Sequence, residues 1–361
     1  MSVAIKIEHA RKVYGENVII PDLSIQINKG EFFTLLGSSG CGKTTLLRMI
    51  AGFNTIEGGD FYFNDKRIND IPRNKRNIGM VFQNYAVFPH MTAFENVAFG
   101  LEQRKIGTAE KTQKVEQMLE MVQISSLRNR KPQNMSGGQQ QRIALARAIV
   151  INPDVLLMDE PLSNLDAKLR IEMRSVIREI QKKSGITTVY VTHDQSEALA
   201  MSDRIAIMNR GVIQQIGTPA RVYCHPRNLF CATFIGESNI LDAKIADKRN
   251  VQFKDGYKFN IPNLKEGLKI DKDIKVCIRP DEFEFSENGV RGKVVSRTFL
   301  GSCYDYQVEL SGSAIVKVET KTYIKLREIG DDVFLSFNPE IINVFDSESE
   351  MSLMDNIEEA I

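Results

Sequence analysis

A glycine-rich segment, Gly37-Ser-Ser-Gly-Cys-Gly-Lys43-Thr44, constrains the fold of this chain more than any other feature of its sequence. It follows the short apolar run FFTLLG and precedes TTLLRMIAG, whose helical spacing ends at a glycine. A buried strand, a tight turn and a helix in this order form a phosphate-binding unit of α/β proteins. The pattern G-x-x-x-x-G-K-[ST] would arise by chance in roughly 1 in 100 chains of this length. We therefore interpret it as a nucleotide site.

The residue types of this segment match the chemistry of a triphosphate. Glycines let backbone N–H groups converge on phosphate oxygens because no Cβ stands in the way. The helix that starts near Lys43 adds the positive end of its dipole, and Lys43 adds a point charge for the β- and γ-phosphates. The Thr44 hydroxyl is a ligand for Mg²⁺. We expect ATP to be bound by Gly37, Ser38, Ser39, Gly40, Cys41, Gly42, Lys43, Thr44 and Thr45.

A second polar segment ends another apolar run, Val155-Leu-Leu-Met-Asp159-Glu160. Four apolar residues indicate a buried strand, which places the two acids at its carboxyl end. One carboxylate there can hold Mg²⁺, directly or through its waters, and the other can polarise an attacking water. Alone, such a run is also compatible with a strand that simply ends at solvent. Beside the phosphate loop, it predicts Asp159 as a metal ligand and Glu160 as a general base.

Apolar runs alternate with helical stretches through the first part of the chain. The runs FFTLLG, VLLMDE and TTVYVTHD are interleaved with the helical patterns QQQRIALARAIV and KLRIEMRSVIREIQKKSG. Buried strands that alternate with helices predict an α/β core with a mostly parallel sheet. Upstream, IKIEHARKVY and DLSIQI alternate as strands do. Residues 91–127 look helical, with no strong strand between, and we predict a helical insert at about residues 88–150.

The pattern changes after about Gly236. Strand-like segments joined by short turns, among them VRGKVVSRTFLGSCYDYQVEL, AIVKVET and DVFLSFN, predict a small all-β domain, an OB-like barrel. We therefore divide the chain into an ATP-binding domain, residues 1–236, and an accessory or regulatory domain, residues 237–361. The acidic tail SESEMSLMDNIEEAI is expected to be mobile or weakly helical.

Charge balance and the lack of long apolar runs narrow the function classes. The chain has 47 Lys and Arg against 46 Asp and Glu, a formal net charge of +1, without the basic excess typical of nucleic-acid-binding proteins. No apolar run approaches the roughly 18 residues of a membrane span, and the charged N-terminus is unlike a signal peptide. Five cysteines without a CxxC indicate free thiols in a reducing compartment. We expect no nucleic-acid partner, and a cytosolic protein that reaches a membrane only through a partner.

The string Met135-Ser136-Gly137-Gly138-Gln139 stands directly before a predicted helix. A serine hydroxyl, two glycine N–H groups and a helix N-terminus together form a second anion site. Here the sequence resembles the ABC ATPase family, whose signature is usually written LSGGQ; Met135 replaces leucine by another apolar residue. The resemblance implies a head-to-tail homodimer. Each ATP would lie between the phosphate loop of one subunit and residues Ser136, Gly137, Gly138 and Gln139 of the other.

Other residues match elements of this family in the expected order. By this resemblance Tyr14, in VYG, stacks on adenine, although an ordinary strand aromatic would look the same. Gln83, in MVFQNYAVFP, senses Mg²⁺ or water, and Asp166 ends the loop Ser-Asn-Leu-Asp that runs across the dimer contact. His193, in VYVTHD, meets the γ-phosphate. The resemblance therefore gives catalytic roles to Glu160, His193 and Gln83. The remaining histidines match no such position: His9, His90 and His225.

The resemblance extends over the whole chain. The segments FPHMTAFENVAFGL, FIGESNI and IRPDEFEF are similar to the importer branch that carries a C-terminal accessory barrel. It implies transmembrane permease subunits as direct partners, an extracytoplasmic solute-binding protein as an indirect one, and a place on the cytoplasmic face of the membrane. The likeness favours an importer of polyamine or ferric iron, with phosphonate, sulfate or sugar importers as alternatives.

Three other functions stay open at this point. A soluble ABC protein that acts on DNA or the ribosome would usually carry two cassettes or a long coiled coil. A small-molecule kinase would share the phosphate loop but leave Met135–Gln139 and His193 without a role. An exporter cassette is more often fused to its membrane domain or lacks the barrel. For the importer, we expect ATP binding to close the dimer and hydrolysis to reopen it.

Overall fold

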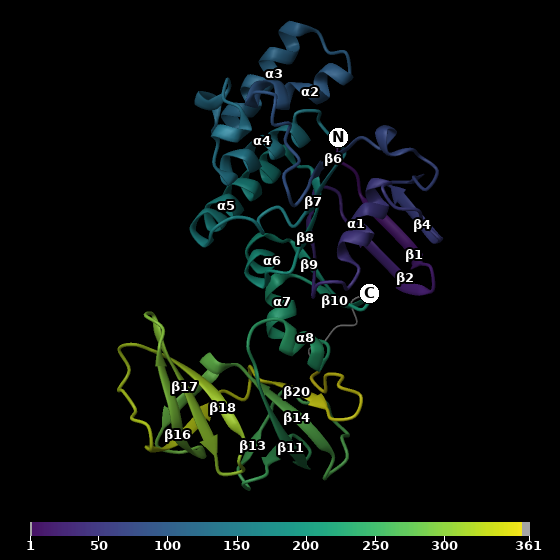
Figure 1. The fold of residues 1–361 in the computed structure, drawn as a ribbon. Coiled ribbons are helices and arrows are strands. Elements are labelled where there is room, and N and C mark those ends of the chain that lie inside the picture. The colour runs from purple at the N-terminus through teal and green to yellow at the C-terminus, as the bar shows by residue number, and fades with distance from the viewer. Residues whose placement is uncertain (1, 356–361) are drawn as a thin grey trace. The chain divides into compact units, whose positions relative to one another are not determined.

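The computed structural model describes residues 2–355 of the 361-residue chain (Figure 1). The chain divides into two compact units, the first ending at Pro219 and the second beginning at Ala220. Compact units need not coincide with sequence domains, so the boundary expected between residues 236 and 237 stays a prediction. Within residues 2–355, no helix combines the length and the apolar character needed to cross a membrane.

A six-stranded sheet is the framework of the first unit, with strand order β10-β9-β3-β8-β7-β6. The strands are β3 (Phe32–Gly37), β6 (Ile78–Val81), β7 (Val155–Asp159), β8 (Thr187–Thr192), β9 (Arg204–Asn209) and β10 (Val212–Gly217). Every pair is parallel except β9 with β10. The prediction of a mostly parallel sheet is confirmed. Strands β3, β7 and β8 are buried along their whole length, as a sheet covered on both faces requires.

The two faces of this sheet belong to two different apolar cores. Along β7, Leu156 and Met158 point into one core, and Val155 and Leu157 into the other, because successive strand side chains alternate between faces. The first core is packed by five helices: α2 (Ala93–Gln103), α3 (Thr108–Met121), α4 (Gly137–Ile149), α5 (Ala167–Ser184) and α6 (Gln195–Met201). The second core is packed by helix α1 (Lys43–Ala51) and by a separate antiparallel sheet.

That separate sheet has the order β2-β1-β4-β5, and all its pairs are antiparallel. Its strands are β1 (Ile5–Tyr14), β2 (Asn17–Ile27), β4 (Gly58–Phe63) and β5 (Lys66–Arg67). The sequence predicts β1 and most of β2, because apolar and polar residues alternate there. It does not show that these strands leave the parallel sheet, since the partner β4 of β1 lies far along the chain.

The predicted helical insert is present. Figure 1 shows α2, α3 and α4 grouped at one end of the first unit, and α2 packs against both of the others. Helix α2 begins with a capping box, in which Glu95 N–H donates to Thr92 Oγ1 at 3.2 Å and Thr92 N–H donates to Glu95 Oε2 at 2.7 Å. Short 3₁₀ turns connect the longer elements: Arg73–Lys75, Ser125–Leu127, Pro132–Asn134 and, in the second unit, Pro280–Glu282.

Two five-stranded antiparallel sheets form most of the second unit, which confirms the predicted all-β region. One sheet contains β13 (Lys258–Asn260), β12 (Asn250–Phe253), β11 (Asn239–Asp247), β14 (Asp273–Ile278) and β20 (Asn343–Asp346). The other contains β15 (Phe283–Ser286), β19 (Asp332–Phe337), β16 (Val290–Phe299), β17 (Cys303–Leu310) and β18 (Ile315–Lys321). Both sheets contribute to one core, for example through Val276 and Val308. Helices α7 (Pro219–Cys224) and α8 (Leu229–Phe234) precede the strands.

The expectation of a mobile or helical tail is wrong for the residues that the structure describes. Met351 forms a β-bridge with Asn228, Ser352 with Phe345, and Met354 with Leu264. Leu353 and Met354 are buried in the core of the second unit. The acidic residues around them dominated the prediction, whereas the spaced apolar side chains decide the packing. Residues 356–361 of the predicted tail lie outside the described residues.

Candidate functional site

The carboxyl ends of three neighbouring strands bring the predicted residues together. In the order β3-β8-β7, Leu36 pairs with Thr192, and Asp159 pairs with Val191. The phosphate loop after β3, the two acids at the end of β7 and His193 after β8 therefore share one edge of the sheet. Ligands of open α/β sheets bind at this edge.

The phosphate loop joins β3 to α1 as predicted. Gly42, the N-cap of α1, has φ of 103°, a left-handed conformation that favours glycine. The cap makes no side-chain hydrogen bond. Lys43 is only 4% exposed, and its Nζ donates to the backbone oxygens of Gly37 and Ser38 at 2.8 Å each. The ammonium is thus held within the loop that should receive the triphosphate.

Cys41, which we expect among the ATP-binding residues, is buried in the same loop. Its Sγ lies 3.7 Å from Lys43 Nζ. The neighbouring Ser38, Ser39 and Gly40 are exposed, and Thr44 and Thr45 occupy the first turn of α1. Their roles toward ATP stay predictions.

Asp159 and Thr44 meet across the sheet edge. Thr44 Oγ1 donates to Asp159 Oδ1 at 2.7 Å, and Asp159 Oδ2 lies 3.8 Å from Arg48 NH2. Asp159 is 6% exposed and is the last residue of β7. A hydroxyl and a carboxylate side by side are hard oxygen donors of the kind that Mg²⁺ takes, together with phosphate oxygens and waters. The donor set fits the predicted cation.

Glu160 and His193 form a pair beside this position. His193 Nδ1 lies 3.1 Å from Glu160 Oε2, so this contact engages Nδ1 and not Nε2. Glu160 has φ of 45°, an uncommon conformation for a residue with a side chain, and its N–H donates to Val191 O at 3.0 Å. Such outliers persist where the surroundings impose them, often at functional sites. The geometry fixes the direction of this carboxylate.

Gln83 lies in the turn that follows β6, and it is exposed. Its backbone oxygen accepts a hydrogen bond from Asn164 Nδ2 at 2.9 Å. Asn164 belongs to the loop of residues 163–166, so this loop is tied to the Gln83 turn within one chain. The roles of the Gln83 side chain in catalysis and metal binding stay predictions.

The signature string forms the start of α4. Ser136 is the N-cap, with Gln139 N–H donating to its Oγ at 3.4 Å and Ser136 N–H donating to Gln139 Oε1 at 3.1 Å. A Cβ on Gly138 would lie 2.6 Å from Leu169 Cδ2, so α4 and α5 approach closely here. Gly137 is the first helical residue. Helices α1 and α4 pack in the two different cores, so their N-termini come from opposite faces of the sheet.

Asp166 and Tyr14 stand on elements other than β3, β7 and β8. Asp166 is the N-cap of α5, and its Oδ1 accepts from Leu169 N–H at 3.0 Å. Tyr14 ends β1 with 48% of its surface exposed, and Lys12 Nζ lies 4.5 Å from its ring centroid. Lys12 itself is buried and donates to Glu57 Oε1 at 2.8 Å. Tyr14 is therefore about half exposed, with a cation over its ring.

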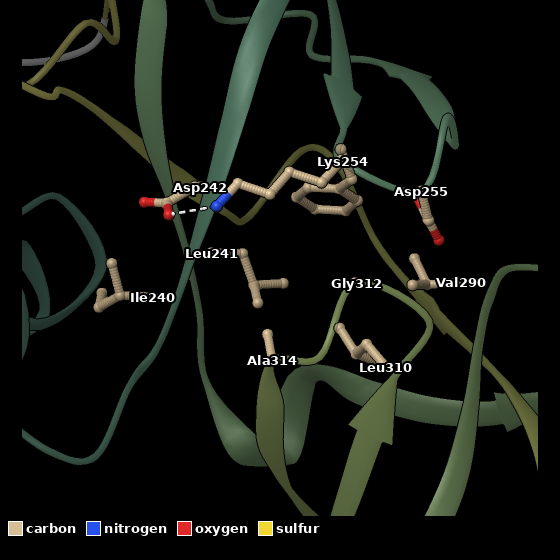
Figure 2. Close-up of a pocket in the computed structure, with 10 residues that line it drawn as sticks. Ile240, Leu241, Asp242, Lys254, Asp255, Val290, Leu310, Gly312 and Ala314 are labelled. Carbon is tan, nitrogen blue, oxygen red and sulfur yellow. Dashed lines mark hydrogen bonds and ion pairs between the residues drawn. The ribbon is translucent and has the colours of Figure 1, made fainter.

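The second unit contains a small cavity of about 100 Å³, shown in Figure 2. Most of its lining is apolar, with Leu241, Ala314 and Leu310 facing one another below an ion pair. In that pair Lys254 Nζ lies 2.9 Å from Asp242 Oδ2. The Lys254 contact is the foremost of the interactions that lower the pKa of Asp242, and Lys275 adds to it. The charge of this carboxylate is therefore balanced by the neighbouring lysines.

Three residues near the site escaped the sequence analysis: Lys12, Asn164 and Arg170. Each acts through a contact with a distant segment, Lys12 with Glu57, Asn164 with Gln83 and Arg170 with Asp194. No local spacing signals such contacts. Arg170 stands four residues after the helix cap Asp166, but that position alone would predict only an exposed helical arginine.

Two family profiles match this chain. Residues 20–163 match the family described as "ABC transporter", and residues 276–345 match the "TOBE domain". The chain is 52% identical over 362 residues to the Fe(3+) ions import ATP-binding protein FbpC of Fusobacterium nucleatum. This alignment covers 99% of this chain and 97% of the relative. It is 55% identical over 342 residues to the spermidine/putrescine import ATP-binding protein PotA of Bacillus cereus, which covers 94% and 98%.

Two solved structures share the fold of the first unit. One is the dimeric structure of a post-hydrolysis state of the ATP-binding cassette MJ0796 bound to ADP and Pi, with TM-score 0.54 and 30% identity, covering 60% of this chain and 98% of that one. The other is cbiO1 from Clostridium perfringens, part of the ABC transporter complex cbiONQ, with TM-score 0.58 and 29% identity, covering 62% and 91%.

Proposed function

Since the chain belongs to the ATP-binding subunits of ABC importers, an ATPase family, we propose that paired copies of it couple ATP binding and hydrolysis to solute uptake through membrane subunits. One observation carries the pairing. The N-termini of α1 and α4 come from opposite faces of the sheet, although both present serine or glycine residues suited to phosphate. A single ATP is enclosed by both only when α4 comes from a second copy.

ATP binds at the edge formed by β3, β7 and β8. Lys43 and the loop N–H groups hold the phosphates, and Tyr14 stacks on the adenine. Thr44 and Asp159 would hold Mg²⁺, with Gln83 as a further ligand. The cation would neutralise charge on the phosphates. The support for this assignment is the 2.7 Å contact between Thr44 Oγ1 and Asp159 Oδ1, which places two oxygen donors beside the loop.

Hydrolysis proceeds by attack of water on the γ-phosphate, with cleavage of its bond to the bridging oxygen and release of ADP and phosphate. Glu160 accepts the proton of that water, and His193 and Gln83 orient the reacting groups. The Glu160–His193 contact at 3.1 Å supports the first part, because it fixes one carboxylate oxygen and leaves the other for water. Ser136 and Gly138 of the partner subunit close over the γ-phosphate. Most of the rate enhancement then comes from positioning and charge stabilisation.

The same proposal places the chain on the cytoplasmic face of a membrane. Its direct partners are transmembrane permease subunits, and an extracytoplasmic solute-binding protein acts with them. The relatives named FbpC and PotA support ferric iron or a polyamine as the solute. Uptake assays with ferric iron and with spermidine, using vesicles that contain the chain and its co-purified permease, distinguish the two.

The substitution Glu160→Gln tests the hydrolytic role. It keeps the size and removes the carboxylate, so we expect ATP affinity within about twofold of the wild type and turnover at least about 100-fold lower. The variant with ATP should elute as a dimer in size-exclusion chromatography. Glu179→Gln is the matched control, because Glu179 lies exposed on α5 and pairs with Lys183. Unimpaired hydrolysis in Glu160→Gln would refute the general-base assignment.

A further inference from the structure

One arginine of helix α5 reaches two loops of the proposed site at once. Arg170 NH2 donates to the backbone oxygen of Leu165 at 3.2 Å, and its NH1 donates to Asp194 Oδ2 at 3.1 Å. Leu165 stands next to Asp166 in the loop of residues 163–166. Asp194 directly follows His193. A single guanidinium therefore bridges the loop before α5 and the segment that carries the histidine.

The segment around His193 is held on both sides by the same cluster. Thr192 Oγ1 accepts from Asp194 N–H at 3.0 Å and donates to Glu197 Oε2 at 2.7 Å. Asp194 Oδ1 accepts from Glu197 N–H at 3.0 Å and so caps α6. His193 thus has little freedom to move without Asp194.

In this cluster the positive charges of two arginines lie next to the negative charges of two carboxylates. Glu197 is 2% exposed, accepts from Tyr190 Oη at 2.8 Å, and its Oε1 lies 3.8 Å from Arg170 Nε. Arg174, one turn along α5, lies 3.6 Å from Asp194 Oδ1. Burial acts to raise the pKa of Asp194, but the Glu197 N–H and the two arginines outweigh it and lower the pKa. The carboxylate that Arg170 holds is therefore charged near neutral pH.

We propose that Arg170 is a positioning residue for ATP hydrolysis. Through its guanidinium, the segment that carries His193 moves together with the loop of residues 163–166. The inference rests on the proposed function, in which that loop lies at the dimer contact and His193 at the γ-phosphate. When a second copy presses on the loop, the Leu165 carbonyl moves the guanidinium, and the guanidinium moves Asp194 and His193. Dimer closure and histidine placement then become one event.

Arginine suits this task better than lysine. Its planar guanidinium offers five N–H donors in a fixed geometry, so it can bind a carbonyl and a carboxylate together. A lysine ammonium on a flexible stem can satisfy one of the two acceptors with the same charge, but it does not fix their relative position. Arg170→Lys therefore keeps the charge and removes the bridge.

The test compares Arg170→Met, Arg170→Lys and Arg178→Met in the full chain. Arg178 lies two turns further along α5, pairs with Asp203 instead, and has a similarly covered side chain, 21% against 29% exposed. We expect both Arg170 variants to lower kcat by about tenfold and to leave the affinity for ATP within about twofold. Arg178→Met should lower the melting temperature by a similar amount and leave kcat within about twofold.

A double-mutant cycle with His193→Ala tests whether Arg170 acts through His193. If Arg170 acts through His193, Arg170→Lys should cause no further loss of single-turnover rate in the His193→Ala background. Independent, multiplicative losses would overturn the inference and leave the proposed role of His193 intact. A His193→Ala variant that turns over like the wild type would overturn both. Equal losses of kcat in Arg178→Met and Arg170→Met would also overturn it, since the effect would then be one of stability alone.

Discussion

Helices α1 and α4 both begin at a sequence that predicts an anion site, but their first turns are built differently. The N-cap of α1 is Gly42, which has no side chain and makes no side-chain hydrogen bond. The N-cap of α4 is Ser136, whose hydroxyl and N–H are both engaged by Gln139. The N–H groups of α1 face the phosphate loop uncapped, whereas one of those at α4 is already satisfied by the protein.

The difference indicates that the two helix starts serve different steps, ATP binding at α1 and turnover at α4. An uncapped helix start beside a buried lysine leaves its first N–H groups available to phosphate, so the α1 site should bind ATP in a single subunit. A self-capped start is stable without a ligand, and its serine hydroxyl can still donate to an anion. The α4 site should therefore contribute to turnover and not to the first binding step.

The largest effect is expected at α1. Lys43→Ala removes charge-assisted contacts to the phosphates, each worth about 1.5–3 kcal/mol, so ATP affinity should fall by about 100-fold. Fluorescent-nucleotide titration at protein concentrations that keep the chain monomeric measures this. A thermal melt checks that the loop still folds, because Lys43 also holds the carbonyls of Gly37 and Ser38. An ATP affinity within twofold of the wild type would contradict the expectation that the α1 site binds ATP in a single subunit.

A smaller effect of another kind is expected at α4. Ser136→Ala should lower turnover by about tenfold and leave ATP binding to the monomer unchanged, because in the proposed dimer the serine serves the ATP of the partner. Thr92→Ala is the matched control, since Thr92 forms the same capping box at α2, outside the proposed site. Both variants should lose about 1 kcal/mol of cap stability, but only Ser136→Ala should lose turnover. Weakened binding to the monomer would contradict this division.

The smallest effect is expected from Gln139→Ala. It removes the contact to Ser136 N–H and should lower the free energy of unfolding by about 0.5 kcal/mol, with turnover reduced by no more than about threefold. Glu95→Ala makes the same change at α2. Denaturant titration and steady-state ATPase assays compare the pair. A turnover loss as large as that of Ser136→Ala would instead support the nucleotide contact that the family resemblance implies for Gln139, beyond its role in capping the helix.

Local sequence patterns predicted most of the fold. The strand, loop and helix around Lys43, the capping box at Ser136 and the glycine that ends α5 at Gly185, with φ of 61°, are all properties of a few adjacent residues. The all-β region was predictable for the same reason, because alternation within each strand is local. For the site, residues at strand ends were predictable because neighbouring parallel strands present their carboxyl ends at one edge.

Features that depend on distant partners were not predictable. The antiparallel sheet of the first unit needs β1 to pair with β4, and register between separated segments leaves no local mark. The Arg170 bridge joins Leu165 to Asp194, and only the packing of α5 against α6 shows it. The tail was misread because its acidic residues are adjacent in sequence, whereas its apolar partners are elsewhere.

The pairing of that tail also bears on how the polypeptide matures during translation. Leu229 N–H donates to Glu350 O, and Ser352 N–H donates to Arg227 O. These two contacts must therefore wait until roughly 120 more residues have been synthesised, about ten seconds at typical elongation rates. The first unit also joins distant segments, since β3 pairs with β8 and β9, but these partners precede Pro219, so this sheet can form while the second unit is still being synthesised. Cofactor capture could then begin before the polypeptide is released.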